Sequence, residues 1–121
     1  MTSTPIQRAS RGEVWLVEFD PAVGAEIRKR RPALVVTSPG VGRLALEIVV
    51  PLTDWKGFYD SYAWFVQIPA TAANGLNKDS GADAFQVKSI SQERFVRHLG
   101  AVTPQQLQDV VAAIALSVGF P

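Results

Sequence analysis

The chain has 121 residues, of which 47% are apolar, with 12 Lys or Arg, 11 Asp or Glu and a formal net charge of +1. This length is typical of one domain, and the apolar content excludes a chain that is disordered by composition. There is no cysteine and only one histidine, His98. Disulfides, thiolate metal sites and a two-histidine acid–base pair within the chain are therefore excluded.

Residues 1–11 are polar and predict a loose N-terminal segment ahead of a single domain over 12–121. The segment has no apolar stretch of signal-peptide length, and no later stretch approaches the ~20 apolar residues of a membrane-spanning helix. We therefore expect a soluble protein of the cytoplasm.

Runs of β-branched and aromatic residues predict strands over 12–19, 32–38, 44–53, 62–68 and 84–90. The segment 20–31 is expected to be a loop, which at that length is usually functional or disordered, and 69–83 is expected to be rich in turns. Pro51 suggests that the third strand ends at an edge or bulge. A short helical turn over 91–95 and a final strand over 96–102 complete the pattern. Closely spaced strands without a crossover helix favour an antiparallel sheet or small barrel.

The C-terminal segment changes to a helical period. Thr103 is expected to cap a helix, Pro104 suits its first position, and Gln106 completes a capping box. Gly119 is expected to end the helix. The apolar face that packs on the sheet is expected to be Leu107, Val110, Val111, Ile114 and Val118. The predicted fold class is thus mainly β with a C-terminal helix (α+β).

Four consecutive cations end the 20–31 loop, directly before Pro32. Such a run is either a solvated loop or a clamp for a polyanion, whose phosphate oxygens match the planar donor fork of arginine. Because Pro32 fixes the backbone where a strand begins, we expect Arg31 to be the aimed cation. The other three are expected to supply a diffuse positive field: Arg28, Lys29 and Arg30.

Three further residues are candidates for proton chemistry. Thr53 ends the third predicted strand, where a hydroxyl is either turn chemistry or a functional group. Glu26 is the acid nearest the basic run, and the plain expectation for it is an ion pair with Arg28 or Arg30. His98 lies far along the chain from these residues and is expected to have a structural or surface role.

Aromatic residues divide into two groups. Those in the predicted strands are expected to be mostly core: Trp15, Phe19, Trp64, Phe65 and Phe85. The others either stack on unpaired bases or cover the edge of the core: Trp55, Phe58 and Tyr59, beside Lys56. Three later cations would extend a phosphate track: Lys88, Arg94 and Arg97.

Taken together, the stretch "RGEVWLVEFDPAVGAEIRKRRPALVVTSPG" resembles the opening of the MazF/PemK family of bacterial toxins, the ribonuclease halves of toxin–antitoxin pairs. The resemblance continues through "VVPLT", "KGF", "QVKSI" and the C-terminal helix, and it is strongest to the MazF branch. Ala25 and Phe85 depart from the pattern, where relatives carry Ser and Asp. The segment "ATAANGLNKDSGAD" is also longer than expected. These departures bear on sequence preference more than on the type of reaction.

The resemblance implies a small SH3-like, PemK-type antiparallel barrel that forms a homodimer and cleaves single-stranded RNA without a metal or cofactor. It further implies that the 2′-hydroxyl attacks the adjacent phosphate, and that a cognate antitoxin occupies the RNA groove. Matched position by position, it implies Arg31, Thr53 and Glu26 as catalytic residues. With the basic run and the loop aromatic included, the RNA-binding set is Arg28, Lys29, Arg30, Trp55, Lys56, Gln86, Lys88 and Ser89.

In this scheme Arg31 stabilises the charge on the phosphate and is not a base, since guanidinium barely deprotonates. Thr53 would bind or protonate beside it, and Glu26 would orient Arg31 or accept the proton. The alternatives are a toxin of the same fold that poisons gyrase, and a nucleic-acid-binding module. Gyrase-poisoning relatives depend on an aromatic helix end, whereas this helix ends "ALSVGFP" with only Phe120, which favours the nuclease.

Overall fold

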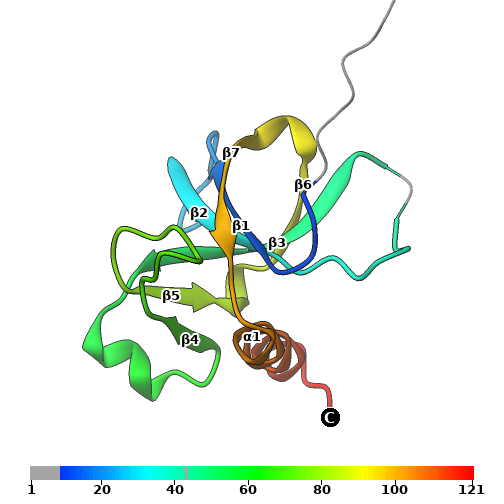
Figure 1. Ribbon diagram of the computed structural model, residues 1–121. Helices are drawn as coiled ribbons and strands as arrows, with labels where there is room; N and C mark the ends of the chain where they lie inside the picture. The colour runs from blue at the N-terminus through cyan, green and yellow to red at the C-terminus, as the bar shows by residue number, and fades with distance from the viewer. Residues whose placement is uncertain (1–8, 43) are drawn as a thin grey trace, which may run out of the picture.

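The computed structural model describes residues 9–42 and 44–121, and within them the chain forms an antiparallel sheet and a C-terminal helix (Figure 1). The strands are β1 (Glu13–Glu18), β2 (Arg30–Val35), β3 (Leu46–Asp54), β4 (Phe65–Ile68), β5 (Ser80–Asp83), β6 (Lys88–Ser91) and β7 (Phe95–Ala101). The helical elements are the short 3₁₀ turns η1 (Gly57–Ser61), η2 (Ala84–Gln86) and η3 (Gln92–Arg94), and the helix α1 (Pro104–Ser117). The expected mainly β fold with one C-terminal helix is confirmed.

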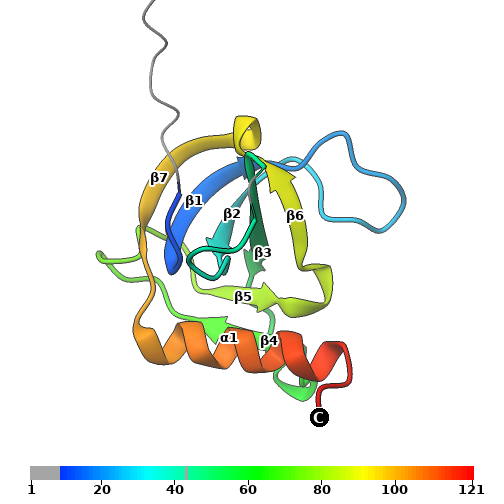
Figure 2. The ribbon, with the colours of Figure 1, turned by 90° about the vertical axis from the view of Figure 1, so that its right-hand side faces the viewer.

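The strands follow the order β4-β5-β3-β2-β1-β7, and β6 pairs with β3 outside this path. The long strand β3 has two partners on one side: its residues 46–49 pair with β6 and its residues 52–54 with β5. The sheet therefore divides at β3, and α1 packs against β4 and η2 at the lower end (Figure 2).

Alternation along the strands separates two apolar clusters. The cluster that includes α1 contains Val14, Leu34, Val50, Leu52, Ile68 and Val110. The other contains Trp15, Val17, Phe19, Ala33, Val35 and Val49. Trp15 and Phe19 are thus core residues as predicted, and successive residues of β2 and β3 contribute to opposite clusters.

Pro51 does not lie at an edge or at the end of its strand. It is buried inside β3, opposite Ala33 of β2. On the other side of β3, Pro51 falls between the residues that pair with β6 and those that pair with β5. A missing backbone N–H costs no ladder hydrogen bond in such a gap, which explains how a central strand accepts proline.

The strand predicted over 84–90 was wrong in its bounds. The chain forms β5 earlier, inside the segment expected to be turns, and β6 later, with η2 between them. The Asp83 carboxylate accepts a hydrogen bond from the Phe85 backbone N–H at 3.2 Å, which caps η2 and interrupts the strand. Phe85 is consequently 73% exposed and not part of the core.

The helix prediction is confirmed at its start. Thr103 Oγ1 accepts from the Gln106 N–H at 3.1 Å, and Gln106 Oε1 accepts from the Thr103 N–H at 3.0 Å, which is the capping box. At the other end, Val118 is 72% exposed because it lies after the last helical residue, and it does not join the packed face.

At the N-terminus, most of the segment predicted to be loose, residues 1–8, lies outside the described residues. Ala9 packs into the core, and Arg11 donates to the Val36 carbonyl. Within the described part of the chain, no helix has the length and apolar content needed to cross a membrane.

Candidate active site

Arg31 and Thr53 lie on adjacent strands. In the β2–β3 ladder Ala33 stands opposite Pro51. Continued by two residues along each antiparallel strand, this register sets Arg31 opposite Thr53, with both side chains on the same face of the sheet. Arg31 is also paired with Val17 of β1. The two residues that the sequence singles out, 22 positions apart in the chain, therefore come from neighbouring strands at one end of the sheet.

A hollow of about 380 Å³ opens beside Arg31, and we call it the Arg97 hollow. Its polar lining includes Arg31, Asp54, Asn77, Lys78, Ser80 and Arg97. Thr53 is not part of the lining, whereas its neighbours Leu52 and Asp54 are, because successive side chains of a strand point to opposite faces. Arg31 thus lies between this hollow and the face that carries Thr53.

The charge of Arg31 is not neutralised by a carboxylate. The ion pairs among the described residues join Arg30 to Glu18 and Lys78 to Asp54, and the Glu13 carboxylate lies beside His98. Arg31 itself is partly buried, and its buried Nε has no hydrogen-bond partner in the described part of the chain. A partly desolvated cation without a partner is unfavourable, so this guanidinium attracts an anion.

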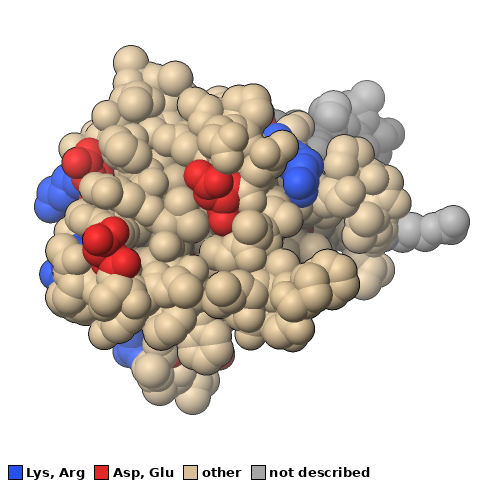
Figure 3. Space-filling view, turned by 90° about the horizontal axis from the view of Figure 1, so that it is seen from below, with Lys and Arg blue, Asp and Glu red and all other residues tan. Residues whose placement is uncertain are grey.

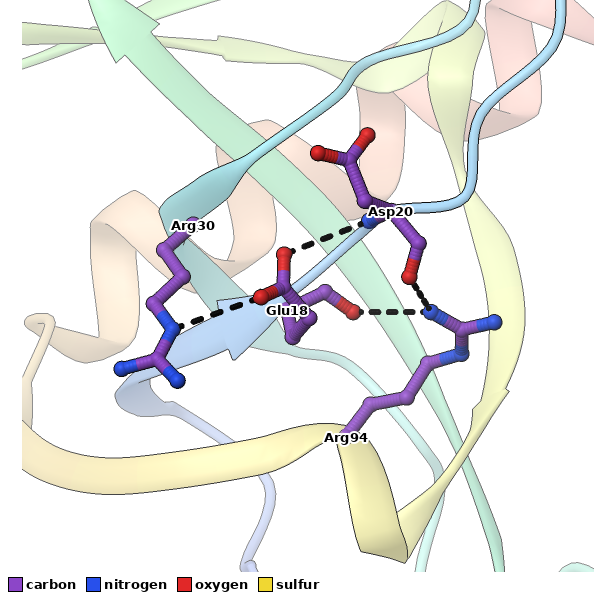
Figure 4. Close-up of polar contacts among 4 residues, drawn as sticks. All are labelled: Glu18, Asp20, Arg30 and Arg94. Carbon is purple, nitrogen blue, oxygen red and sulfur yellow. Dashed lines mark hydrogen bonds and ion pairs between the residues drawn. The ribbon is translucent and has the colours of Figure 1, made fainter.

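The loop between β1 and β2 is anchored at its base by the contacts of two arginines (Figure 4). Arg30 Nε lies 3.4 Å from Glu18 Oε1. Arg94 Nη1 donates to the backbone carbonyls of Glu18 at 3.0 Å and Asp20 at 2.7 Å. Arg94 therefore fixes the point where the chain leaves β1, and this structural role was missed when it was assigned to a phosphate track.

The other two members of the basic run lie in the loop itself. Arg28 donates to the Gly24 carbonyl, and both it and Lys29 are exposed. Lys29 has a φ of +66°, a left-handed conformation that is unusual for a residue with a side chain. Its carbonyl accepts from the Phe19 N–H at 2.9 Å, which closes the base of the loop. The run is thus split: Arg30 and Arg31 are on β2, and Arg28 and Lys29 face solvent.

Glu26 does not pair with Arg28 or Arg30. Its Oε1 accepts from the Val23 N–H at 2.7 Å, and its own N–H donates to the Val23 carbonyl at 3.2 Å. A hydrogen bond three residues away is available without ordering a second long side chain, which explains why it replaces the expected ion pair. Glu26 is held within the exposed loop.

Gln86 joins this loop to the other side of the site. Its Oε1 accepts from the Ile27 N–H at 2.5 Å, and its Nε2 donates to Asp83 Oδ2 at 3.3 Å. Both partners demand the same orientation of the amide, since a backbone N–H only donates and a carboxylate only accepts. Burial raises the pKa of the Asp83 carboxyl, although hydrogen bonds from Phe85 and Gln86 oppose the rise. Sequence reasoning assigned Gln86 to RNA binding and missed both this tether and Asp83.

The remaining predicted RNA contacts are spread over several elements. Trp55 is half-buried, with its ring edge-on to Tyr59 at 5.8 Å between centroids, and Lys56 is exposed before η1. On β6, Lys88 is paired with Val49. Ser89 lines a separate hollow of about 180 Å³ that does not include Arg31.

His98 has the structural role expected of it. Its Nε2 lies 3.3 Å from Glu13 Oε2, and its ring stands edge-on to Trp15 at 5.3 Å between centroids. These contacts hold β7 to β1.

Residues 10–118 match the family model of the PemK-like, MazF-like toxin of type II toxin–antitoxin systems. The chain is 36% identical over 112 residues to "Endoribonuclease MazF9" of Mycobacterium tuberculosis, covering 88% of this chain and 92% of that protein. Its structure resembles MazF from Deinococcus radiodurans with a TM-score of 0.75 and 23% identity, over 92% of this chain and 96% of the other. It also resembles a mycobacterial endoribonuclease in complex with its cognate antitoxin, with a TM-score of 0.73 and 18% identity, over 94% and 98%. The match over nearly the whole chain shows that this protein belongs to the PemK-like, MazF-like toxin family of type II toxin–antitoxin systems.

Proposed function

We propose that the protein is a sequence-selective endoribonuclease toxin that cleaves single-stranded RNA by attack of the 2′-hydroxyl on the adjacent phosphate. The products would be a 2′,3′-cyclic phosphate and a 5′-hydroxyl end. The observation that carries the proposal is the partly buried Arg31 side chain, which has no carboxylate partner among the described residues. Arg31 is on the strand next to that of Thr53, and the strand register sets the two residues opposite each other. The relatives named endoribonucleases support the reaction class.

This reaction requires few functional groups from the protein, and Arg31 and Thr53 supply most of them. RNA carries its own nucleophile, so the protein has to position the strand, stabilise the charge that grows on the phosphate, and move a proton. We assign charge stabilisation to Arg31, because a preorganised cation in a partly dry site acts strongly on developing charge. The hydroxyl of Thr53, on the same face, would hydrogen bond the same phosphate.

Proton transfer falls to Glu26 in this proposal. The carboxylate is exposed on the loop that holds Arg28 and Lys29, and one of its oxygens accepts from the Val23 N–H. In the structure this carboxylate is held within the loop and hydrogen bonds to neither Arg31 nor Thr53. We therefore propose that it reaches the RNA from the loop when the strand is bound, as catalytic contacts often tighten only in the complex.

The direct test is the chemistry of the products. Purified protein is incubated with a structureless RNA in EDTA, and the RNA ends are analysed. We expect cleavage at a short motif with cyclic phosphate and 5′-hydroxyl ends, and no cleavage of an oligomer with a single 2′-deoxy residue at the mapped position. Cleavage of the deoxy oligomer would show that water is the nucleophile, and RNA that is bound but stays intact would identify a binding module.

We further propose that the toxin acts in the cytoplasm as a homodimer, inhibited by a cognate antitoxin. The face seen from below carries few charged side chains (Figure 3). The end of the α1 segment exposes Leu116, Val118 and Phe120, and Leu116 also lines an apolar hollow of about 320 Å³ with Trp64 and Phe85. Exposed apolar patches rimmed by polar residues are typical of protein–protein contacts. A toxin–antitoxin family with a relative solved as an antitoxin complex supports the partner.

A further inference from the structure

We propose that the Arg97 hollow is a subsite for one nucleotide of the RNA strand, next to the phosphate held at Arg31. The inference rests on the proposed function and adds to it a site on the far side of Arg31 from Thr53. The hollow is lined by residues of β1, β2, β3, β5 and β7 and by the β4–β5 loop, which lies in the segment that is longer than the family resemblance predicts.

The wall of the hollow is a preformed loop. Asn74, 1% exposed, organises it: its Oδ1 accepts from the N–H groups of Thr71 and Leu76, both at 3.0 Å, and its Nδ2 donates to the Pro69 carbonyl at 2.8 Å. A buried amide with its hydrogen-bonding groups used in this way holds the loop in one conformation. The loop therefore presents Asn77 and Lys78 to the hollow at fixed positions.

Two glycines lock this loop onto β7. Gly75 has a φ of +69°, and a Cβ there would lie 2.1 Å from the Leu99 carbonyl oxygen. A Cβ on Gly100 would lie 2.2 Å from the Ala73 carbonyl oxygen. The Ala101 N–H also donates to Ala73 at 2.9 Å. Because the backbones touch directly, the distance between the loop and Arg97 on β7 is set by the main chain.

The lining combines an apolar floor with a cationic rim. The floor is formed by Leu16, Pro32, Leu52, Leu76 and Leu99. On the rim, Lys78 Nζ lies 3.7 Å from Asp54 Oδ2, whereas Arg97 is exposed and belongs to none of the ion pairs in the described part of the chain. The Arg97 guanidinium thus remains uncompensated, among the described residues, at the edge of a hollow that Arg31 also lines.

These properties match a nucleotide. A volume of about 380 Å³ lies within the range of about 300–1,000 Å³ typical of small-molecule sites. A base presents apolar faces to a floor of this kind, and its phosphate presents oxygens that match an arginine fork. Arg31 borders both the hollow and the Thr53 face, so a strand whose phosphate contacts Arg31 places its neighbouring nucleotide within reach of Arg97.

The test is a binding measurement with a probe that the protein cannot cut. A fluorescent RNA oligomer with a 2′-deoxy residue at the mapped cleavage position is titrated with the purified protein, in the oligomeric state in which it is isolated. The titration is repeated at salt concentrations from about 50 to about 300 mM. For Arg97→Gln we expect binding about fivefold weaker at low salt. The slope of log affinity against log salt is expected to fall in magnitude by about 0.7, the value for one phosphate contact on a single strand. Arg11→Gln makes the same charge change away from the hollow and is expected to leave the slope unchanged.

A second variant tests the floor independently of charge. Asn77→Trp is expected to fill the hollow, since Asn77 is exposed on its wall. A wild-type protein should bind more weakly to an oligomer with an abasic residue beside the cleavage position, and Asn77→Trp should lose that difference. An unchanged slope for Arg97→Gln, or an abasic penalty that Asn77→Trp retains, would overturn the inference.

The outcomes separate this inference from the proposed function. If wild-type protein does not cleave RNA, the proposed function fails, whatever the hollow does. If it cleaves and both hollow variants bind like wild type, only the subsite fails. If Arg97→Gln changes the molecular mass in solution while circular dichroism shows a folded chain, the hollow is a contact between copies and not an RNA subsite.

Discussion

At the scale of single residues, the hydrogen-bond and ion-pair partners of each arginine indicate whether it has a structural role or is available for a ligand. Arg94 donates hydrogen bonds to two backbone carbonyls, and Arg30 forms an ion pair with Glu18. Arg31 is on the same strand as Arg30, yet its guanidinium has no carboxylate partner among the residues that the structure describes. A run of like charges is therefore not one functional unit here: of the two arginines on β2, Arg30 is paired and the partly buried Arg31 is available for an anion.

Asp83 leads to a prediction about pH. Its pKa is raised above the ordinary value of 3.8 chiefly by burial, so folding favours the protonated form. The contribution of Asp83 to stability is therefore largest below pH 3.8, falls as the pH rises through the raised folded-state pKa, and is constant above it. We expect Asp83→Asn to remove this dependence. Urea unfolding of both proteins across acidic pH should show the stability of wild type, relative to the variant, declining as the pH rises from 3.8; a relative rise would contradict the account.

At the scale of elements, the β4–β5 loop behaves as part of the sheet although its composition is that of turns. Buried Asn74 and the close contact of Gly75 with Leu99 replace the regular ladder. The loop then leads into β5, whose sequence SGAD has low β-propensity and which forms because β3 and β4 pair with it on both sides.

We expect Gly75→Ala to destabilise the protein by about 3 kcal/mol or more, because the left-handed conformation strains any side chain and the new Cβ would meet the Leu99 carbonyl. Gly40→Ala is a matched control: Gly40 has a φ of +81° and nothing within 4 Å of its added Cβ, so only the strain of about 1 kcal/mol remains. Chemical denaturation of both variants measures the difference. Equal losses of unfolding free energy in the two variants would contradict this, because they would show that the loop moves away from the new Cβ of Gly75→Ala at little energetic cost.

At the scale of the whole molecule, the basic run and the apolar C-terminal end belong to different elements. The cations of the basic run lie in the β1–β2 loop and at the start of β2, whereas Leu116, Val118 and Phe120 are exposed at and just after the end of α1. This separation fits a toxin that binds RNA with one surface and protein with another.

The homodimer is tested by sedimentation over a range of concentrations. We expect a mass twice the 13.1 kDa of one chain, and a shift toward the monomer for Leu116→Glu, because a charge would be buried in an apolar contact. Ala112→Glu, exposed on the same helix, serves as the control. A wild-type mass of one chain at every concentration would contradict the dimer.

Much of the fold could be predicted because local signals agree with it. The capping box at Thr103 and the alternation in β1 to β3 depend on residues close in sequence. Pro51 and β5 could not be placed from sequence, since each depends on which strands lie alongside. Phe85 was misplaced for another reason: the Asp83 cap interrupts the strand and sets Phe85 in η2. The site follows the same division: the Pro32 junction indicated Arg31, whereas the Gln86 tether to Ile27 joins residues 59 positions apart and leaves no local pattern.

The central claim is that the Arg31 guanidinium stabilises the phosphate in the transition state. The most direct measurement is the single-turnover rate of RNA cleavage in EDTA, at saturating protein, for wild type, Arg31→Ala and the control Arg11→Ala. The account predicts a loss of about 100-fold or more for Arg31→Ala, the scale of one lost donor to developing charge, with Arg11→Ala near wild type. A folded Arg31→Ala protein that cleaves at close to the wild-type rate would contradict it.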